Sequence, residues 1–387
     1  MQFARGEEMV FPGFVDLHVH LREPGATDKE DIAHGTQAAA AGGAVAVFDM
    51  VNNPGHLTNS PEAVEEKEDI ARQQAQVDFG MHYRFQPEEN NVGTFKRVIP
   101  KVHGLKSMLE ISTGSDKQTA PAEFRDGWQE WHRVAGPHQP IILHTERQTV
   151  AEALAIAAGE IGHPTHVAHV SNRAELETVM AAKRRGLPVT CGVTLHHLFM
   201  DNTDVQDWYQ RMKPPLAEPG DNEFLWDHLA DIDIVETDHA PHTRAEKELA
   251  NEQNPNGRDD GPVKSYGVPG LEAVVPLLFT ALGQAHGFRS HFRGKHIEMS
   301  DLMRMLVRRP REILGLPAGN KGTSVRVRFG QYEFGQDDIY SKCGWSPYSG
   351  WLVNAKVVQV DLRGTTIFQT GEFLGRPQGR VIYPENA

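Results

Sequence analysis

Phe14-Val15-Asp16-Leu17-His18-Val19-His20 is a mostly apolar run near the start of the chain, and it ends in two histidines two positions apart. On a β-strand such residues point to the same face, because side chains alternate. Two imidazoles presented in this way can bind one divalent metal, and imidazole is a ligand that zinc and its neighbours favour. Arg22 adds a fixed cation two residues later. An isolated pair of this kind also arises by chance, so its meaning depends on further ligands elsewhere in the chain.

Eight short apolar runs, of which Phe14–Val19 is the first, are predicted to be strands. The other seven are Ala44–Met50, Val77–Arg84, Gly104–Leu109, Pro140–His144, Thr165–Val170, Pro188–Val193 and Ile232–Thr237. Segments of helical character lie between most of them, for example Lys29–Ala41, Glu62–Gln76, Thr149–Ala158, Asn172–Arg185 and Glu223–Leu229. Buried runs that alternate with helices favour a parallel sheet, and eight such units favour an α/β fold closed into a (β/α)8 TIM-type barrel.

The last part of the chain has a different pattern. From about Gly322, apolar and polar residues alternate, as in Ser324–Arg328 and Ala355–Val360, which is typical of antiparallel strands. Met1–Val10 is too short for a domain and is expected to add a strand to this C-terminal part. The prediction is therefore a barrel over residues 11–320 and a small β-rich lobe formed by residues 1–10 and 321–387. The polar segment Asn251–Lys264 is expected to be a long loop.

The composition limits the classes of partner. The 387 residues include 39 basic and 52 acidic side chains, which give a net charge of −13 and disfavour a nucleic acid or an anionic membrane as partner. The only cysteines, Cys191 and Cys343, indicate neither a disulfide framework nor a cysteine-based zinc site. No signal peptide or long apolar span is recognisable, so a cytoplasmic location is expected.

Six residues with metal-ligand chemistry fall at or near the carboxyl ends of the predicted strands. They are His18 and His20 in the first, Lys106 in the fourth, His144 in the fifth, His169 in the sixth and Asp238 after the eighth. In a barrel these strand ends converge on one face, where catalytic residues gather. Each residue alone is more often a satisfied core or surface group, but their joint placement at one end favours a metal site.

Lys106 has two interpretations. A buried lysine is costly unless it is paired or neutral, so the side chain either reaches the barrel rim or pairs with Glu110. Alternatively the neutral amine adds carbon dioxide and becomes a carbamate, an anionic bridge between two metals. The other five ligands suffice for two metals only if such a bridge exists, which favours the carbamate.

These motifs resemble those of a known family. Pro12–Gly25 is similar to the opening signature of dihydroorotases in the amidohydrolase superfamily, and Asp238-His239-Ala240-Pro241-His242 to their closing signature. Further matching motifs fall between and after them in the expected order: Gly104-Leu105-Lys106, His144-Thr145-Glu146, His169-Val170-Ser171, His196-His197-Leu198-Phe199 and Val268-Pro269-Gly270. The resemblance covers nearly the whole chain and is nearest to the dihydroorotase domain of the animal multifunctional pyrimidine-synthesis protein.

The resemblance implies a role for each matched residue. His18, His20 and Asp238 would bind the more buried of two divalent metals, with Zn²⁺ the expected ion, and His144 and His169 the more exposed one. Carboxylated Lys106 would bridge them. Substrate would be held by three residues that contact its carboxylate and by a nearby glycine: Arg22, Asn52, His242 and Gly267.

The implied reaction is the reversible interconversion of L-dihydroorotate and N-carbamoyl-L-aspartate in pyrimidine biosynthesis. A hydroxide between the metals would attack the ring amide, and Asp238 would act as general base and then acid. A homodimer is expected by analogy, and aspartate transcarbamoylase is a further expected partner.

Departures from the family pattern leave alternatives open. Lys213 stands where relatives carry Arg or Asn, and Gly192 stands where some carry Glu, which weakens the case for a third metal. Glu110–Lys117 could cover the substrate, with Ser112 and Thr113 as contacts, and His197 is as consistent with packing as with the site. The competing functions are another cyclic-amide hydrolase, such as allantoinase or dihydropyrimidinase, and a silent scaffold for aspartate transcarbamoylase. Arg22 favours a substrate with a carboxylate, and the retained ligands disfavour the scaffold.

Overall fold

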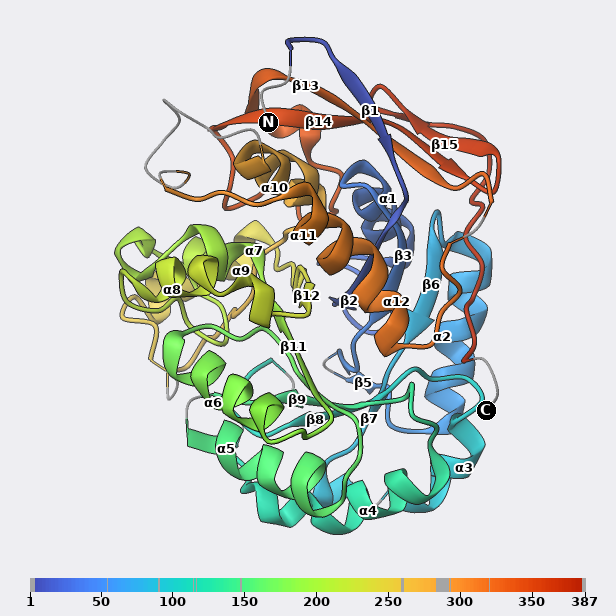
Figure 1. Cartoon of the computed structure of the whole chain (residues 1–387), viewed down its shortest axis with the longest axis vertical. Helices are drawn as coiled ribbons and strands as arrows, with labels where there is room; N and C mark the ends of the chain where they lie inside the picture. The colour runs from blue at the N-terminus through green and yellow to red at the C-terminus, as the bar shows by residue number, and fades with distance from the viewer. Residues whose placement is uncertain are drawn as a thin grey trace.

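A mixed α/β architecture with parallel and antiparallel sheets organises the chain (Figure 1). The structure is a computed structural model that describes residues 4–53, 55–89, 91–113, 115, 117–146, 148–258, 261–282, 292, 294–319 and 321–384. The ends of the predicted lobe, residues 1–3 and 385–387, and Asn320 at the end of the predicted barrel lie outside these ranges. Among the described residues no helix has the length and apolar character needed to cross a membrane.

Parallel strands arise in all eight predicted runs. One sheet has the order β2 (Phe14–Val19), β3 (Ala44–Asp49), β6 (Asp78–Met81). The other has the order β12 (Ile234–Val235), β11 (Val189–Val193), β10 (Thr165–Val167), β9 (Ile141–His144), β8 (Leu105–Met108), β7 (Tyr83–Arg84). β10 and β12 end earlier than predicted, because left-handed backbone at His169 (φ 41°) and Asp238 (φ 45°) bends the chain out of the ladder.

Hydrogen bonds join the two parallel sheets at both of their edges. The run of β6 and β7 belongs to both sheets, and within it the His82 N–H donates to the Asp49 carbonyl at 3.1 Å. At the other edge the His20 N–H donates to the His239 carbonyl at 2.7 Å, and Val19 forms a parallel bridge with His239. The first parallel strand, β2, therefore meets the segment that follows the last parallel strand, β12.

Helices follow most of the parallel strands. Their bounds are α1 Ile32–Ala41, α2 Pro61–Gln74, α3 Phe95–Val98, α4 Arg125–Val134, α5 Gln148–Leu154, α6 Arg173–Arg184, α7 Leu195–Phe199, α8 Asp221–Asp227, α9 Arg244–Gln253, α10 Val274–Leu282, α11 Met299–Met303 and α12 Arg309–Ile313. Ser60 and Asn172 cap α2 and α6 by accepting from the N–H three residues later.

The predicted loop Asn251–Lys264 is wrong at its start, because α9 continues to Gln253. A capping box between Thr243 and Glu246 begins this helix, and Ala250 is buried against the rest of the chain. Asn254 then ends it, since its side-chain amide donates to the carbonyls of Arg258 and Val263.

The two ends of the described chain share one antiparallel sheet, with the order β1 (Glu8–Phe11), β13 (Ser324–Phe334), β14 (Trp351–Leu362), β15 (Thr365–Gln369), β16 (Glu372–Phe373). Glu8 pairs with Arg328 and Phe11 with Val325. Figure 1 shows this sheet at the top of the view beside α10, which is buried along its whole length. Phe279 of α10 packs edge-on against Phe11 at 5.0 Å between ring centres.

Glu30 links the C-terminal segment to the chain beside the predicted site. It precedes α1, is fully buried, and accepts the backbone N–H of Lys342 at 3.2 Å. Its other carboxyl oxygen lies 3.4 Å from Nε2 of His239, the neighbour of Asp238. Burial raises the pKa of this carboxyl from its usual 4.5 to about 8.

This raised pKa predicts that Glu30 makes stability fall as pH rises. Between about pH 4.5 and 8 the folded chain keeps a proton that the unfolded chain releases, so the free energy of unfolding decreases through this range. We expect Glu30→Gln to remove a slope of up to about 1.4 kcal/mol per pH unit. Urea unfolding of both proteins at pH 5, 6, 7 and 8 measures the difference, and parallel pH profiles would contradict the prediction.

Candidate active site

One small pocket brings together all six predicted metal ligands. His18 is the last residue but one of β2 and His20 follows this strand, Lys106 lies on β8, His144 ends β9, His169 follows β10 and Asp238 follows β12. Each of these side chains is buried. Because parallel strands present their carboxyl ends at one edge, residues far apart in the sequence meet here.

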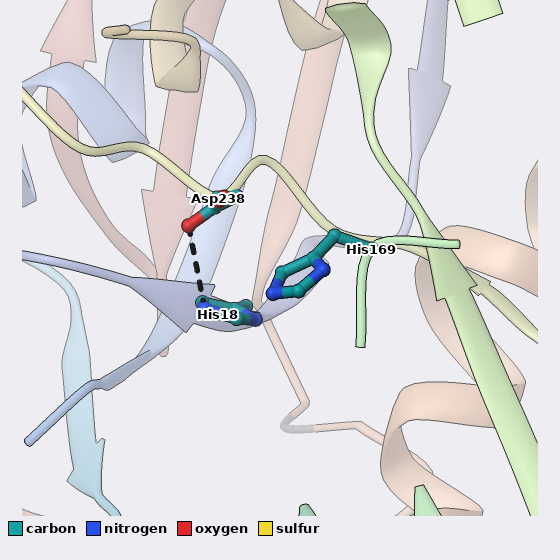
Figure 2. Close-up of side chains that lie close together, drawn as sticks. All are labelled: His18, His169 and Asp238. Atoms are coloured by element: carbon teal, nitrogen blue, oxygen red, sulfur yellow. Dashed lines mark ion pairs between the residues drawn. The ribbon is translucent and has the colours of Figure 1, made fainter. Parts of the chain in front are cut away.

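The ring nitrogens and the Asp238 carboxylate lie within coordination range of one another. Oδ1 of Asp238 is 3.0 Å from Nε2 of His20 and 3.3 Å from Nε2 of His18. Figure 2 shows the His18 ring between Asp238 and His169, and donor atoms of these three residues all lie within 4.8 Å of one another. Nδ1 of His144 lies 2.8 Å from Nε2 of His169.

The protonation states of these groups fit a divalent cation. Burial lowers the pKa of all four imidazoles well below the usual 6.5, so the rings are neutral at neutral pH, which is the form that binds metals. Burial also raises the pKa of Asp238 to about 8, because removal from solvent disfavours the charged form, so a cation that binds here would displace the proton of this carboxyl group. Four neutral imidazoles and one carboxylate make a donor set of the kind that zinc prefers.

Lys106 is buried, and its Nζ makes no hydrogen bond within the described ranges. Neither the rim position nor the pairing with Glu110 occurs, because Glu110 instead accepts from the Thr149 hydroxyl at 2.7 Å. Burial lowers the pKa of Lys106 to about 8, so an appreciable fraction of the amine is unprotonated near neutral pH. A free amine among metal-type donors has the chemistry needed to add carbon dioxide.

The backbone is left-handed at three residues of this pocket. Arg22 (φ 60°), His169 (φ 41°) and Asp238 (φ 45°) are three of the five non-glycine residues with positive φ in the described part of the chain. Such a conformation costs roughly 1–2 kcal/mol for a residue with a Cβ atom, and it concentrates at functional sites. The bends turn side chains at the strand ends toward the pocket.

The predicted substrate residues differ in what they offer. Arg22 is fully buried and lines the pocket, and its Nε donates to the Pro241 carbonyl at 3.2 Å. Its two terminal nitrogens have no hydrogen-bond partner among the described residues. Gly267 (φ 135°) also lines the pocket, and a Cβ there would lie 2.5 Å from the Ala240 carbonyl oxygen.

Asn52 and His242 form hydrogen bonds with other protein groups. Asn52 lies beyond the second parallel strand, because β3 stops at Asp49 and Asn52 belongs to the short hairpin of β4 (Asn52–Asn53) and β5 (His56–Leu57). Its amide donates to the Thr113 carbonyl at 2.6 Å. His242 is not among the pocket-lining residues, and its ring nitrogens lie 2.9 Å from the Tyr266 carbonyl and 3.2 Å from Glu246.

Of the other residues that the sequence left open, some line the pocket and some do not. Ser112, Thr113 and Lys213 line it, whereas His197 bonds to Thr194 and to the Pro214 carbonyl and does not. Within Glu110–Lys117, Gly114 and Asp116 lie outside the described residues.

Sequence reasoning missed one buried acid beside the ligands. Glu236 follows β12, and its carboxylate lies 3.5 Å from Nδ1 of His18. Burial raises its pKa, but interactions with His166 and His169 outweigh that effect and lower the pKa below the usual 4.5. The available signal was a charged residue inside the apolar run Ile232–Thr237.

Comparison with known proteins assigns the family. A family described as dihydro-orotase-like matches residues 7–85. The dihydroorotase of Halobacterium salinarum is 33% identical over 418 residues, which cover 98% of this chain and 90% of that protein. The chain belongs to the dihydroorotase family. The dihydroorotase of Geobacillus thermodenitrificans is 30% identical, with 95% and 88% of the two chains covered.

Two further matches of this dihydroorotase family member are a much longer multifunctional protein and a solved structure. Multifunctional protein CAD of Squalus acanthias is 33% identical over 95% of this chain, but the chain spans only 15% of the length of that relative. The L-hydantoinase of Arthrobacter aurescens superposes with a TM-score of 0.83 at 22% identity, covering 98% of this chain and 89% of that one. At this identity the likeness concerns the fold.

Proposed function

We propose that this protein is a dihydroorotase that interconverts L-dihydroorotate and N-carbamoyl-L-aspartate. The similarity to proteins named dihydroorotase supports this assignment. The structural observation that carries it is Arg22, which lines the same pocket as the metal-type donors and whose two terminal nitrogens have no partner in the described part of the chain. A guanidinium edge binds a carboxylate through two parallel hydrogen bonds, and dihydroorotate carries a carboxylate beside its cyclic amide.

We also propose that the parallel strands close into a (β/α)8 barrel over residues 11–320, with residues 1–10 and 321–387 forming a small lobe. The hydrogen bonds from His82 to Asp49 and from His20 to His239 support closure, since they join the sheets at both edges. The pairing of β1 with β13 supports a lobe that uses both chain ends.

The same pocket supports a site for two divalent cations, with Zn²⁺ our proposed ion. His18, His20 and Asp238 would hold one, His144 and His169 the other, and the carbamate of Lys106 would contact both. The neutral rings and the unpaired Lys106 amine support this set. When bound, such cations act as Lewis acids that polarise a carbonyl and lower the pKa of water.

The chain's own residues supply orientation and proton transfer. Arg22 would fix the substrate carboxylate, which aligns the ring amide with Asp238. Asp238 would take a proton from the attacking water at its carboxylate and deliver it to the ring nitrogen that leaves. His18 and His20 flank Oδ1 at 3.3 and 3.0 Å and restrict its position. Thr113, whose carbonyl accepts from the Asn52 amide, lines the same pocket.

A substrate assay with metal analysis tests the function. We expect hydrolysis of dihydroorotate at mildly alkaline pH and two divalent ions per chain. Turnover of allantoin or dihydrouracil without turnover of dihydroorotate would establish the competing cyclic-amide hydrolase instead. Absence of turnover with all three substrates would favour the scaffold. A homodimer, a cytoplasmic location and binding of aspartate transcarbamoylase stay predictions of the resemblance.

Arg22→Gln tests the carboxylate clamp. Loss of a charged hydrogen-bonding pair costs roughly 1.5–3 kcal/mol, so KM for dihydroorotate should rise about 10–100-fold. Arg84→Gln is the matched control, because Arg84 is also buried but pairs with Glu89 outside the pocket. Steady-state kinetics of both variants give the answer, and an unchanged KM in Arg22→Gln would remove Arg22 from substrate binding.

A further inference from the structure

Glu236 contacts groups on two neighbouring elements of the site. Only 1% of its side chain is exposed. Oε1 accepts the backbone N–H of His169 at 2.5 Å. Oε2 lies 3.5 Å from Nδ1 of His18 and 3.6 Å from Nε2 of His166. One carboxylate therefore contacts two of the proposed metal ligands. It faces Nδ1 of His18 and the backbone N–H of His169, whereas Nε2 of His18 faces Asp238 and Nε2 of His169 faces His144.

Gly192 on β11 provides the space for this carboxylate. Gly192 pairs with Ile234 of β12, so it is next to the segment that carries Glu236. A Cβ atom at position 192 would lie 3.0 Å from Cγ of Glu236 and closer still to Cδ and Oε1. The backbone of Gly192 does not have positive φ, so the glycine is needed here for space and not for conformation.

The contact with His169 stabilises a bend in the backbone. His169 has φ 41°, an unfavourable value for a residue with a side chain, and its N–H is bound by Oε1. This bend ends β10 and directs the ring so that Nε2 lies 2.8 Å from Nδ1 of His144. Without the carboxylate, the N–H would be buried without an acceptor.

The contact with His18 selects a tautomer. An ionised carboxylate only accepts hydrogen bonds, so beside Nδ1 it favours the ring with its proton on that nitrogen. Nε2, which lies 3.3 Å from Asp238, then keeps its lone pair for a cation. Nδ1 makes no hydrogen bond among the described residues, so the 3.5 Å contact with Oε2 of Glu236 acts on this ring through charge and not through a formed hydrogen bond.

We infer that Glu236, seated against Gly192, is a positioning residue that fixes the tautomer of His18 and the backbone of His169 for metal binding. The inference rests on the proposed function, because it assumes that these histidines bind metal.

Glu236→Gln is the direct test. Glutamine keeps the size and an acceptor for the His169 N–H, but its amide group donates toward Nδ1 and favours the wrong tautomer of His18. We expect the dissociation constant for Co²⁺ or Zn²⁺, measured by competition with a chelator, to rise about 10–100-fold. The visible spectrum of the Co²⁺ protein should change as well. Glu30→Gln is the matched control, since Glu30 has an equally buried carboxyl group that faces His239, which is not a proposed ligand.

Gly192→Ala provides an independent arm. It keeps Glu236 but displaces its carboxylate, so a comparable loss of metal affinity is expected, whether or not Glu236→Gln folds. Metal affinity equal to wild type in either folded variant, or an equal loss in Glu30→Gln, would overturn the role of Glu236. A wild-type protein that binds no divalent ion would instead refute the proposed function.

Discussion

Lys106→Ala is expected to lose one of the two proposed metal ions and at least about 10³-fold in kcat. A metal ion supplies several kcal/mol of charge stabilisation in the transition state, and about 1.4 kcal/mol corresponds to a factor of ten in rate. Lys106 is the buried group best suited to supply the missing anion, because its amine has no hydrogen-bond partner in the described structure and its pKa is lowered to about 8.

Metal content per chain and the mass of the intact protein check this expectation. Wild type should carry the added mass of one carbon dioxide, and Lys106→Ala should not. Lys247→Met is the control, because Lys247 is also buried but donates to the carbonyls of Trp208 and Ser265. It should lose stability and keep both metals. Two metals in Lys106→Ala would refute the bridging role.

Asp238→Asn is expected to lower kcat about 10²–10⁴-fold in both reaction directions, which is the usual contribution of a general acid–base group. Asparagine keeps the shape and an oxygen beside His18 and His20, but it cannot carry the transferred proton. The fall in kcat should therefore be larger than the loss of bound metal alone would cause. Pre-loading the variant with metal should leave most of the defect in place.

The control for Asp238→Asn lies at the opposite end of the same strand. Asp233 is buried and pairs with Lys183 and Arg309, at 2.5 and 2.6 Å. Asp233→Asn should lower the denaturant midpoint and leave kcat within about twofold of the wild-type value. Its ion pairs contribute to stability, but they do not contact the reacting atoms. If Asp238→Asn retained wild-type kcat, proton transfer would have to be assigned to another group.

The strands and the six candidate ligands that meet in one pocket were predictable from the sequence because each carries a local signal. Buried strands appear as short apolar runs, and a histidine, lysine or aspartate at the end of such a run is conspicuous. The bounds of β10 and β12 were not predictable, because they depend on left-handed backbone at His169 and Asp238. The end of α9 depends on side-chain bonds of Asn254 to residues further along the chain.

Glu236 and Asn52 show why part of the site escaped prediction. The position of Glu236 depends on a missing side chain at Gly192 in a different strand, which is a relation between distant residues. Asn52 follows the predicted strand Ala44–Met50 closely, but the structure places it in a hairpin whose Asn52 amide donates to the Thr113 carbonyl. Local patterns identify candidate groups, whereas their partners are decided by packing.

The junction between His20 and His239 has a consequence for biosynthesis. His20 and Asp238 are in contact although they are 218 positions apart. They lie at the junction between β2 and the segment that follows β12. If the proposed metal site is correct, a nascent chain can acquire an ion shared by both residues only after β12 and Asp238 have left the ribosome. A bound ion would then cross-link two residues that are far apart in the sequence. It would stabilise complete, folded chains and not incomplete ones. Truncated chains that lack Asp238 would not gain this stabilisation and would be more susceptible to proteolysis.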